Sequence, residues 1–379
     1  MEKNTIKNKI QNIQNQTKHY LFEPPPEENV IELEVKPNFK NKNNNFQYIN
    51  VLGSGSFGNV LKSVYTENNI DTTYAVKVLE KAKVKNIEHL MEEVHILKLL
   101  NHPFIIKLEG TFQTTHQLCM VFEPLLNGDL CNLIYFNDEL PKLPFDLILF
   151  YLSTLVIGID YIHNKGIIYR DLKPENIMVN EKGYIKLIDM GLAKRIRYVN
   201  EYTSANGEVV KQIVDEKTYT LCGTPEYLSP EILLNIGYDK STDIWSLGVL
   251  LYELFTKKLP FSGENNMTLL FTNIVKTMRV DYVLANDVKE IIQNEHMENL
   301  LVGLLNGKRD NRVGVKDGTI SIFNHALFSN YKDTINNIMN LTHIPSYIPK
   351  QLEDTSYEPI SSIPNVKLYK GDNAIFANF

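Results

Sequence analysis

The chain has 379 residues, of which 43% are hydrophobic, and a formal net charge of -6. This length predicts one bilobal unit or two domains, and the acidic balance excludes a protein that binds nucleic acid through a general basic surface. Three cysteines without CxxC spacing favour a reducing compartment, so we expect a cytoplasmic protein, with the nucleus left open.

Residues 1–45 form a polar extension that is rich in Asn, Lys and Gln. This composition buries little apolar surface and predicts disorder or loose docking. The chain begins with Met-Glu and has no apolar core of a signal peptide, so neither myristoylation nor secretion is indicated.

Residues 46–124 predict a small lobe built on a β-sheet. Alternating apolar residues favour strands in "FQYINVLG", "NVLKSVY" and "YAVKVLE", and again in "IIKLEGTF" and "LCMVFE". Between these groups, residues 87–100 carry apolar side chains at helical spacing, which predicts one amphipathic helix.

Residues 125–328 predict a larger, mainly helical lobe, and residues 329–379 a C-terminal tail. The apolar stretch from Leu147 contains Ser, Thr and Asp, which favours a buried helix over a membrane span. "YIKLIDMG" predicts a hairpin strand with its turn at residues 181–183, and "TDIWSLGVLLYELF" a helix at the centre of the lobe. The predicted fold class is α+β, with two unequal lobes.

The segment "GSGSFGNV" lies between two predicted strands of the small lobe. Its glycines would allow backbone amides to approach phosphate oxygens closely. A Rossmann dinucleotide site is disfavoured because it needs a helix, not a strand, after the glycines.

Lys77 lies between apolar neighbours in "AVKV", where a charged side chain needs a partner or a ligand. Glu93 on the predicted helix is a candidate partner. Taken alone, Lys77 is equally well explained as a surface charge on an edge strand.

The polar loop "IIYRDLKPENIMVN" crowds charged groups between two apolar runs. Asp171 could serve as a base near an acceptor hydroxyl, and Asn176 with Asp189 could supply oxygen ligands for Mg²⁺. Phosphoryl transfer from ATP needs this kind of positioning and charge neutralisation, with little covalent chemistry by the protein.

The glycine-rich loop, Lys77, Glu93, "YRDLKPEN", "DMG" and "SPE" occur in an order that resembles the eukaryotic protein kinases over about residues 46–328. "YRD" together with "TLCGTPEYLSPE" is similar to the cyclic-nucleotide-dependent branch of the AGC group. The resemblance implies a bilobal Ser/Thr kinase with ATP and Mg²⁺ as cofactors.

The resemblance also implies a role for each matching residue. Asp171 would orient and deprotonate the acceptor hydroxyl, Lys173 would stabilise the transferred group, and Asn176 with Asp189 would hold Mg²⁺. Lys77, supported by Glu93, would bind the α- and β-phosphates. The other nucleotide contacts would come from Leu52, Gly53, Ser54, Gly55, Ser56, Phe57, Gly58, Val60, Ala75, Phe122, Glu123, Leu125, Asp129 and Glu175.

Met190 stands where these kinases usually have the Phe of DFG. Methionine is a flexible apolar filler, so we expect it to pack with Leu97, Leu108 and Tyr169 between the lobes. A live enzyme is therefore favoured over a kinase-like scaffold that binds nucleotide without transferring phosphate.

Thr220 in "KTYTLCGTPEY" matches the activation-loop phosphoacceptor of this branch. Arg170, Lys194 and His89 would receive its phosphate and so order the loop. The preceding insertion, residues 197–217, is polar and contains Asn206-Gly207, which predicts an exposed loop that is mobile or makes a contact of its own.

The resemblance further implies protein substrates with basic motifs. Asp129, Glu175 and Glu253 would bind Arg two and three residues before the acceptor, since carboxylates hold guanidinium groups bidentately. An apolar pocket for the residue after the acceptor would be made by Leu221, Pro225 and Leu228.

Two further matches are structural. Glu231 and Arg312 resemble a buried ion pair that braces the large lobe, and Asp243 an acid in its central helix. The final "NAIFANF" resembles the AGC tail, with Phe376 and Phe379 as anchors on the small lobe.

The N-terminal extension is too short and too polar to be a cyclic-nucleotide-binding domain, so a separate regulatory subunit with such a domain is the expected partner. The end of the tail favours control by cAMP, whereas "HNKGIIYRDLKPEN" and "WSLGVLLYELFTKKLPFSG" are closer to cGMP-dependent kinases. Both kinds of control stay open.

Overall fold

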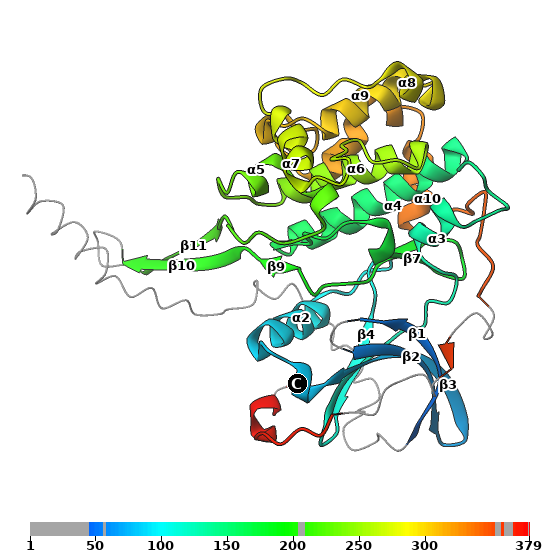
Figure 1. Cartoon of the computed structure of the whole chain (residues 1–379), viewed down its shortest axis with the longest axis vertical. Coiled ribbons are helices and arrows are strands. Elements are labelled where there is room, and N and C mark those ends of the chain that lie inside the picture. Colours follow the sequence, from blue (N-terminus) through cyan, green and yellow to red (C-terminus); the bar gives the residue numbers. More distant parts are fainter. Residues whose placement is uncertain (1–44, 56–57, 204–208, 353–357, 360–366, 378) are drawn as a thin grey trace, which may run out of the picture.

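The computed structural model describes residues 45–55, 58–203, 209–352, 358–359, 367–377 and 379. These residues form a sheet-based lobe and a larger helical lobe, stacked along the long axis in Figure 1. The predicted α+β bilobal fold is confirmed.

The small lobe contains a six-stranded sheet of strand order β12-β1-β2-β3-β5-β4, in which the strand pairs are antiparallel. One helix, α2 (Ile87–Leu99), packs beside it; Asn86 caps this helix by accepting a hydrogen bond from the His89 amide at 3.0 Å. The strands are β1 (Phe46–Ser54), β2 (Gly58–Glu67), β3 (Ile70–Glu80), β4 (Leu108–Gln113), β5 (Gln117–Phe122) and β12 (Glu358–Pro359).

Strand β3 directs alternate side chains into two different cores. Val76 and Val78 join the outer core of the small lobe, whereas Ala75 and Leu79 join the core that continues into the large lobe. Because side chains alternate along a strand, Lys77 lies on the same face as Ala75 and Leu79, toward α2. The strand therefore aims its lysine at the interface between the lobes.

The large lobe is built around α4 and α6, whose side chains are almost all buried. This confirms the predicted central helix. The lobe contains α3 (Leu130–Tyr135), α4 (Phe145–Asn164), α5 (Pro230–Leu233), α6 (Ser241–Thr256), α7 (Met267–Lys276), α8 (Asn286–Ile292), α9 (Glu295–Leu304) and α10 (Lys332–Met339), with the short strand pairs β6 (Ile167–Ile168) with β9 (Lys194–Arg195) and β7 (Ile177–Val179) with β8 (Ile185–Leu187).

Helix α4 is long and apolar enough to cross a membrane by length and composition, and it is the single such helix among the described residues. Most of it is buried inside the large lobe, as a core helix would be. The apolar stretch therefore gives only weak evidence for a membrane span.

The predicted hairpin of "YIKLIDMG" is confirmed. Ile177 pairs with Leu187 and Val179 with Ile185 in an antiparallel register. Gly183 adopts a φ of 81° in the turn and donates its amide to the Asn180 carbonyl at 2.9 Å, a conformation that favours glycine. This hairpin brings Asp189 back beside the polar loop.

The insertion is a β-hairpin in its described parts, so the prediction of an exposed loop was wrong there. Strand β10 (Arg197–Thr203) pairs antiparallel with β11 (Val209–Asp215), and the hairpin projects away from the large lobe in Figure 1. Cross-strand pairing satisfies backbone groups that a loop would leave to solvent, and the β-branched residues of β11 favour it. Asn206-Gly207 lies outside the described residues.

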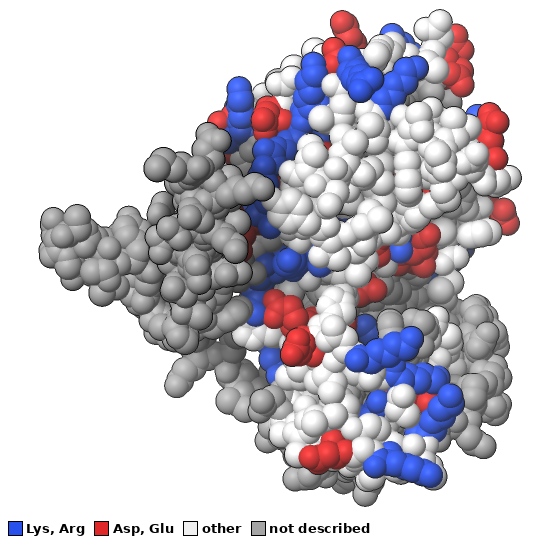
Figure 2. Space-filling model, turned by 60° about the vertical axis from the view of Figure 1, so that its left-hand side comes forward, with Lys and Arg blue, Asp and Glu red and all other residues white. Residues whose placement is uncertain are grey.

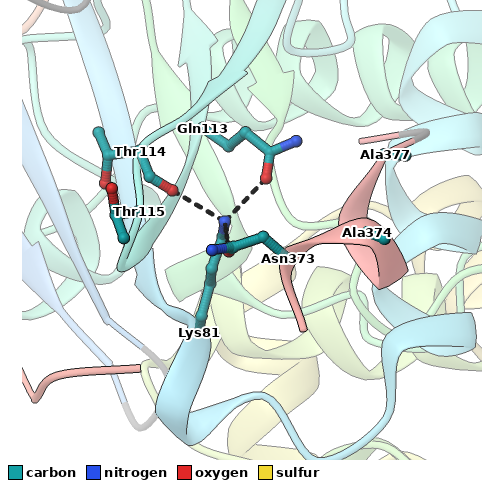
Figure 3. A pocket seen from close by; sticks show the side chains of 7 residues that line it. All are labelled: Lys81, Gln113, Thr114, Thr115, Asn373, Ala374 and Ala377. Atoms are coloured by element: carbon teal, nitrogen blue, oxygen red, sulfur yellow. Dashed lines mark hydrogen bonds between the residues drawn. The ribbon is translucent and has the colours of Figure 1, made fainter. Parts of the chain in front are cut away.

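The C-terminal segment lies against the small lobe, as expected from the tail resemblance. Phe376 and Phe379 are buried, and Gln113 Nε2 donates to the Phe376 carbonyl at 3.0 Å. Figure 3 shows Lys81 pointing into a surface cavity of about 620 Å³, where Nζ donates to Gln113 Oε1 at 2.8 Å and to Asn373 Oδ1 at 2.5 Å. The tail is thus fastened by polar contacts as well as by its aromatic anchors.

Glu231 and Arg312 form the predicted ion pair inside the large lobe. The guanidinium contacts both carboxylate oxygens, at 2.9 and 3.1 Å, and donates to the Ser241 carbonyl at 2.6 Å. Both side chains are almost fully buried, and Arg312 lies 5.2 Å from the ring of Trp245. The pair joins the end of the activation segment to the central helix.

Replacing Arg312 by Ala should lower the free energy of unfolding by about 3 to 5 kcal/mol, because Glu231 would be left as an unpaired buried charge. The measurement is the midpoint of urea unfolding. As a control, Lys350→Ala breaks the exposed pair with Glu139 and should leave the midpoint unchanged. Equal shifts for the two variants would contradict this prediction.

Candidate active site

The polar loop at residues 169–176 is held by one buried carboxylate. Asp243 on α6 accepts the backbone amide of Tyr169 at 2.9 Å and that of Arg170 at 2.8 Å, and it contacts His163 Nε2 at 2.7 Å. Arg170 has a φ of 70°, an uncommon conformation for a residue with a side chain. The two hydrogen bonds from the backbone amides hold this strained residue in place. They therefore also fix the orientation of the next residue, Asp171.

Asp171 lies at the centre of a polar network. Its Oδ1 accepts from Thr224 at 2.8 Å, and its Oδ2 accepts from Asn176 Nδ2 at 2.8 Å and lies 3.0 Å from Lys173 Nζ. Lys173 Nζ also donates to Thr224 at 2.9 Å, which closes the network. The structure therefore brings the predicted base and the predicted phosphate-stabilising lysine together.

Asn176 and Asp189 lie in adjacent segments. The Ile188 amide donates to the Asn176 carbonyl at 3.1 Å, so the residue before Asp189 is hydrogen-bonded to Asn176. Asn176 uses Nδ2 for Asp171, which leaves its Oδ1 as an oxygen ligand, and Asp189 is exposed. Two oxygen donors beside a phosphate site fit Mg²⁺, which binds proteins through few side chains and completes its shell with phosphates and water.

Lys77 is paired with Glu93, at 2.7 Å between Nζ and Oε1. Burial alone would lower the pKa of Lys77, but the carboxylates of Glu93 and Asp189 outweigh it and raise that pKa. The lysine is therefore held as a cation between α2 and the Asp189 segment. This geometry contradicts the alternative that Lys77 is a surface charge on an edge strand.

Apolar side chains surround the space next to Lys77. Ala75 pairs with Phe122 across β3 and β5, and Val60 is directly opposite Lys77 on β2. Leu52, Val60 and Leu125 belong to or pack on the core that joins the lobes. The sheet therefore brings the residues of the predicted adenine site close to Lys77.

The glycines of the "GSGSFGNV" loop differ in how much space surrounds them. A Cβ at Gly58 would lie 1.9 Å from the Val78 carbonyl oxygen, so the close approach of β3 requires this glycine. Gly53 has open space around it, and a Cβ at Gly55 would meet only the Gly58 oxygen at 3.7 Å. Ser54 is exposed, and Ser56 and Phe57 lie outside the described residues.

The side chain of Glu123 in the predicted hinge is held by two other residues. Its Oε1 accepts from Lys186 Nζ at 2.7 Å and from the Lys107 amide at 2.9 Å. Lys186 on β8 is a long-range partner that periodicity does not reveal. Only the backbone of Glu123 is left to contact a nucleotide.

Met190 packs as predicted. It is buried in the same core as Leu97 and Tyr169, with Leu108 packed against that core. The methionine therefore maintains the apolar contact between the lobes at this position.

Two of the three predicted phosphate-binding cations lie by the activation segment. Lys194 Nζ donates to Thr218 at 2.9 Å, and Arg170 contacts the Tyr238 hydroxyl at 3.1 Å, which in turn donates to the Thr220 carbonyl at 2.6 Å. Burial and then the charge of Arg170 lower the pKa of Lys194. Thr220 is exposed. His89 is also exposed, and its side chain is not brought into this cluster by any described contact.

Asp129, Glu175 and Glu253 converge around one thiol. Burial, then Glu175, Asp129 and Glu253 in that order, raise the pKa of Cys131 to about 11. Asp129 also caps α3 by accepting the Asn132 amide at 2.7 Å, whereas Glu175 is exposed. The three predicted acids therefore all lie near Cys131, and we call this cluster of Asp129, Glu175 and Glu253 the acidic groove, after its predicted role.

Glu253 is the least accessible of these acids. It is 4% exposed, and the hydroxyls of Tyr135 and Tyr227 both donate to its carboxylate. Burial and Glu175 raise the pKa of Glu253, while the tyrosine hydrogen bonds oppose them. Glu253 is therefore held by the two tyrosines and is not open to solvent as Glu175 is.

The predicted apolar pocket is only partly assembled. Leu228 is 4% exposed and joins a small core with Ile168 and Ile232, and Pro225 begins a short helical turn. Leu221 is 65% exposed and belongs to none of the described cores.

Thr224 and Tyr135 are site residues that sequence reasoning missed. The sequence feature that could have indicated Thr224 is its place in "GTPEY". The corresponding feature of Tyr135 is its place as the last residue of α3, the helix that Asp129 caps. Neither signal identifies a partner, because Asp171 lies 53 positions from Thr224 and Glu253 lies 118 positions from Tyr135.

The acidic groove should keep Cys131 unreactive at neutral pH. With a pKa of about 11, about one thiol in a thousand is ionised at pH 8, and the thiolate is the nucleophile. Replacing Glu175 by Gln removes a neighbouring negative charge, so it should lower this pKa and speed alkylation. The measurement is the rate of iodoacetamide labelling of Cys131 by peptide mass spectrometry. Glu181→Gln on the exposed β7–β8 turn is the control, and equal rates in both variants would refute the convergence.

The amino-acid sequence is similar to those of known proteins. The protein kinase domain family matches residues 46–328. The cAMP-dependent protein kinase catalytic subunit of Dictyostelium discoideum is 34% identical over 314 residues, which cover 81% of this chain and 43% of that protein. Serine/threonine-protein kinase Sgk1 of Xenopus tropicalis is 34% identical over 320 residues, covering 83% and 69%.

A cGMP-dependent protein kinase of Drosophila melanogaster is 33% identical over 325 residues, covering 79% of this chain and 31% of that protein. The chain spans about half the length of several relatives, as with the 51% of the type 3 cAMP-dependent kinase of Saccharomyces cerevisiae. The family match covers most of the chain, and its relatives are AGC kinases. The chain therefore belongs to the protein kinase family, within the AGC group.

Proposed function

We propose that this chain transfers the γ-phosphoryl group of ATP to Ser or Thr in proteins. The observation that carries the proposal is the hydrogen-bonded network of Asp171, Lys173, Thr224 and Asn176, together with the ion pair of Lys77 with Glu93. Phosphoryl transfer asks the protein for positioning and charge compensation, and this network supplies both.

Each side chain has a distinct task in the proposed reaction. Asp171 is positioned to accept a hydrogen bond from the acceptor hydroxyl and to take its proton as the oxygen attacks. Lys173, now shared between Asp171 and Thr224, can place its ammonium on the transferred group. Lys77, held by Glu93, places positive charge on the nucleotide phosphates.

Asn176 Oδ1 and the Asp189 carboxylate would hold Mg²⁺. When bound, the metal neutralises charge on the polyphosphate. The hydrogen bond between Asn176 Nδ2 and Asp171 keeps the amide oxygen turned away from the base, so one side chain serves both sites.

The acidic groove supports a preference for Arg two and three residues before the acceptor. Glu175 is exposed and Asp129 keeps one oxygen outside its helix cap, so both can pair with a guanidinium. Buried Glu253 strengthens the negative potential from below. Leu228 and Pro225 favour an apolar residue after the acceptor, with exposed Leu221 closing over it.

Phosphorylation of Thr220 is proposed to regulate the enzyme. The residue is exposed, and Arg170 and Lys194 lie beside its segment, so a phosphate there would gain charge-assisted hydrogen bonds. His89 is a further candidate, which would need α2 and the activation segment to approach each other.

A separate regulatory subunit is proposed as partner, in line with the cAMP-dependent relatives. Tyr219, Leu234 and Ile236 are exposed apolar residues near the activation segment, and Tyr219 packs on Gly237. Apolar side chains exposed together mark a surface suited to another protein.

We propose a cytoplasmic enzyme, with the nucleus as a second compartment.

Asp171→Asn should reduce phosphate transfer about 10²- to 10⁴-fold, because the amide cannot accept the hydroxyl proton. The assay is Mg²⁺-dependent transfer from ATP to a serine peptide, after mass analysis of Thr220. Asp317→Asn, an exposed acid remote from the network, should leave the rate unchanged. Undiminished transfer by Asp171→Asn would overturn the assigned base, and no transfer by the Thr220-phosphorylated parent would favour the scaffold alternative.

Replacing both Arg residues of the peptide by Ala should raise KM about a hundredfold or more, since each charge-assisted pair contributes roughly 1.5 to 3 kcal/mol. Glu175→Gln should raise KM for the Arg peptide and leave the Ala peptide unaffected. Steady-state kinetics on the four combinations measure this. A Glu175→Gln variant that loses both peptides equally would show that the groove does not read the Arg residues.

A further inference from the structure

An ion pair joins the helix of the small lobe to the start of the activation segment. Arg195 Nε donates to Glu92 Oε1 and its NH2 group to Glu92 Oε2, both at 2.6 Å. The side chains are 15% and 33% exposed, so the pair is partly shielded from solvent. Two parallel hydrogen bonds fix orientation as well as distance.

Glu92 immediately precedes Glu93 on α2. Glu93 holds Lys77 at 2.7 Å, so any rotation or shift of α2 that breaks the contact of Glu92 also moves the partner of the phosphate-binding lysine. Neighbouring residues on a helix point in different directions, which lets Glu93 face the sheet while Glu92 faces the large lobe.

Arg195 is rigidly connected to the catalytic loop. It lies on β9, where it pairs with Ile167 of β6, while Lys194 pairs with Ile168. Strand β6 leads directly into Tyr169 and Arg170, whose amides are fixed by Asp243. The position of Arg195 is therefore set by the same core that sets Asp171.

The neighbouring cations have other contacts. Lys194 donates to Thr218, and Arg170 reaches the Leu192 carbonyl and the Tyr238 hydroxyl. Burial and then Arg195 lower the pKa of His95, with Glu92 opposing, which places His95 beside this ion pair on α2. The contact between α2 and β9 is thus made by side chains that are separate from the Thr220 cluster.

We propose that Arg195 is a positioning residue for the kinase reaction. Its ion pair with Glu92 holds α2 against β9 and keeps Glu93 on Lys77, independently of phosphorylation at Thr220. The enzyme therefore has a basal activity set by this pair, and a Thr220 phosphate adds a second connection. The inference rests on the proposed kinase function.

The test compares Glu92→Arg, Arg195→Glu and the double swap in the full chain, each with Thr220 intact and with Thr220→Ala. In the Thr220→Ala background each single variant should lower kcat about three- to tenfold and raise KM for ATP, and the double swap should recover most of the loss. With Thr220 phosphorylated the losses should be smaller. The peptide KM should change little throughout.

Arg197→Gln is the matched control. It breaks a similar ion pair with Asp215, two residues along the same segment, and that pair does not touch α2. This variant should keep the parental kcat. Single swaps that behave like Arg197→Gln, or a double swap that recovers nothing, would overturn the proposal.

A readout other than activity separates this proposal from the proposed function. Amide hydrogen exchange across residues 88–98 should become faster in each single swap and return toward the parent in the double swap. If the parent transfers no phosphate, the proposed function fails, and the exchange data still decide whether Arg195 holds α2. Unchanged exchange in the single swaps would refute the positioning role.

Discussion

The catalytic loop depends on the buried carboxylate of Asp243. It lies on a helix with almost no exposed residue and accepts two consecutive backbone amides of the loop, besides contacting His163. A buried carboxylate is costly unless its oxygens are satisfied, and these donors satisfy it. Because Arg170 has a positive φ, the loop would relax without them, and Asp171 would lose its direction.

The rest of the site is placed relative to this fixed loop. The Asn176 carbonyl receives the Ile188 amide, and Asp189 then lies near Lys77 of the other lobe. Two long-range contacts outside the site support the same arrangement: the Glu92–Arg195 pair at α2, and the C-terminal tail on Lys81 and Gln113. The lobes are therefore held together by the shared apolar core and by charges that meet across it.

The distribution of charge is uneven around the catalytic loop. Figure 2 shows Lys and Arg side chains gathered in groups on the face that it draws, on a chain whose formal net charge is -6. Asp129, Glu175 and Glu253 lie together at Cys131, whereas Arg170 and Lys194 lie together by the activation segment. The acidic cluster is therefore suited to a basic peptide, and the basic cluster is suited to a phosphate group.

The fold class, the order of the site segments and the turn at Gly183 could be predicted from the sequence, because these depend on local periodicity and on residues close in the chain. Which distant groups meet depends on the folded structure. Thr224 donates to Asp171, Lys186 binds the side chain of Glu123, and Arg195 pairs with Glu92 at a separation of 103 positions. The insertion became a hairpin through pairing between its two halves, and Leu221 stayed exposed while Leu228 was buried. Such outcomes depend on burial and on charges brought together by the whole fold, and a local pattern contains neither.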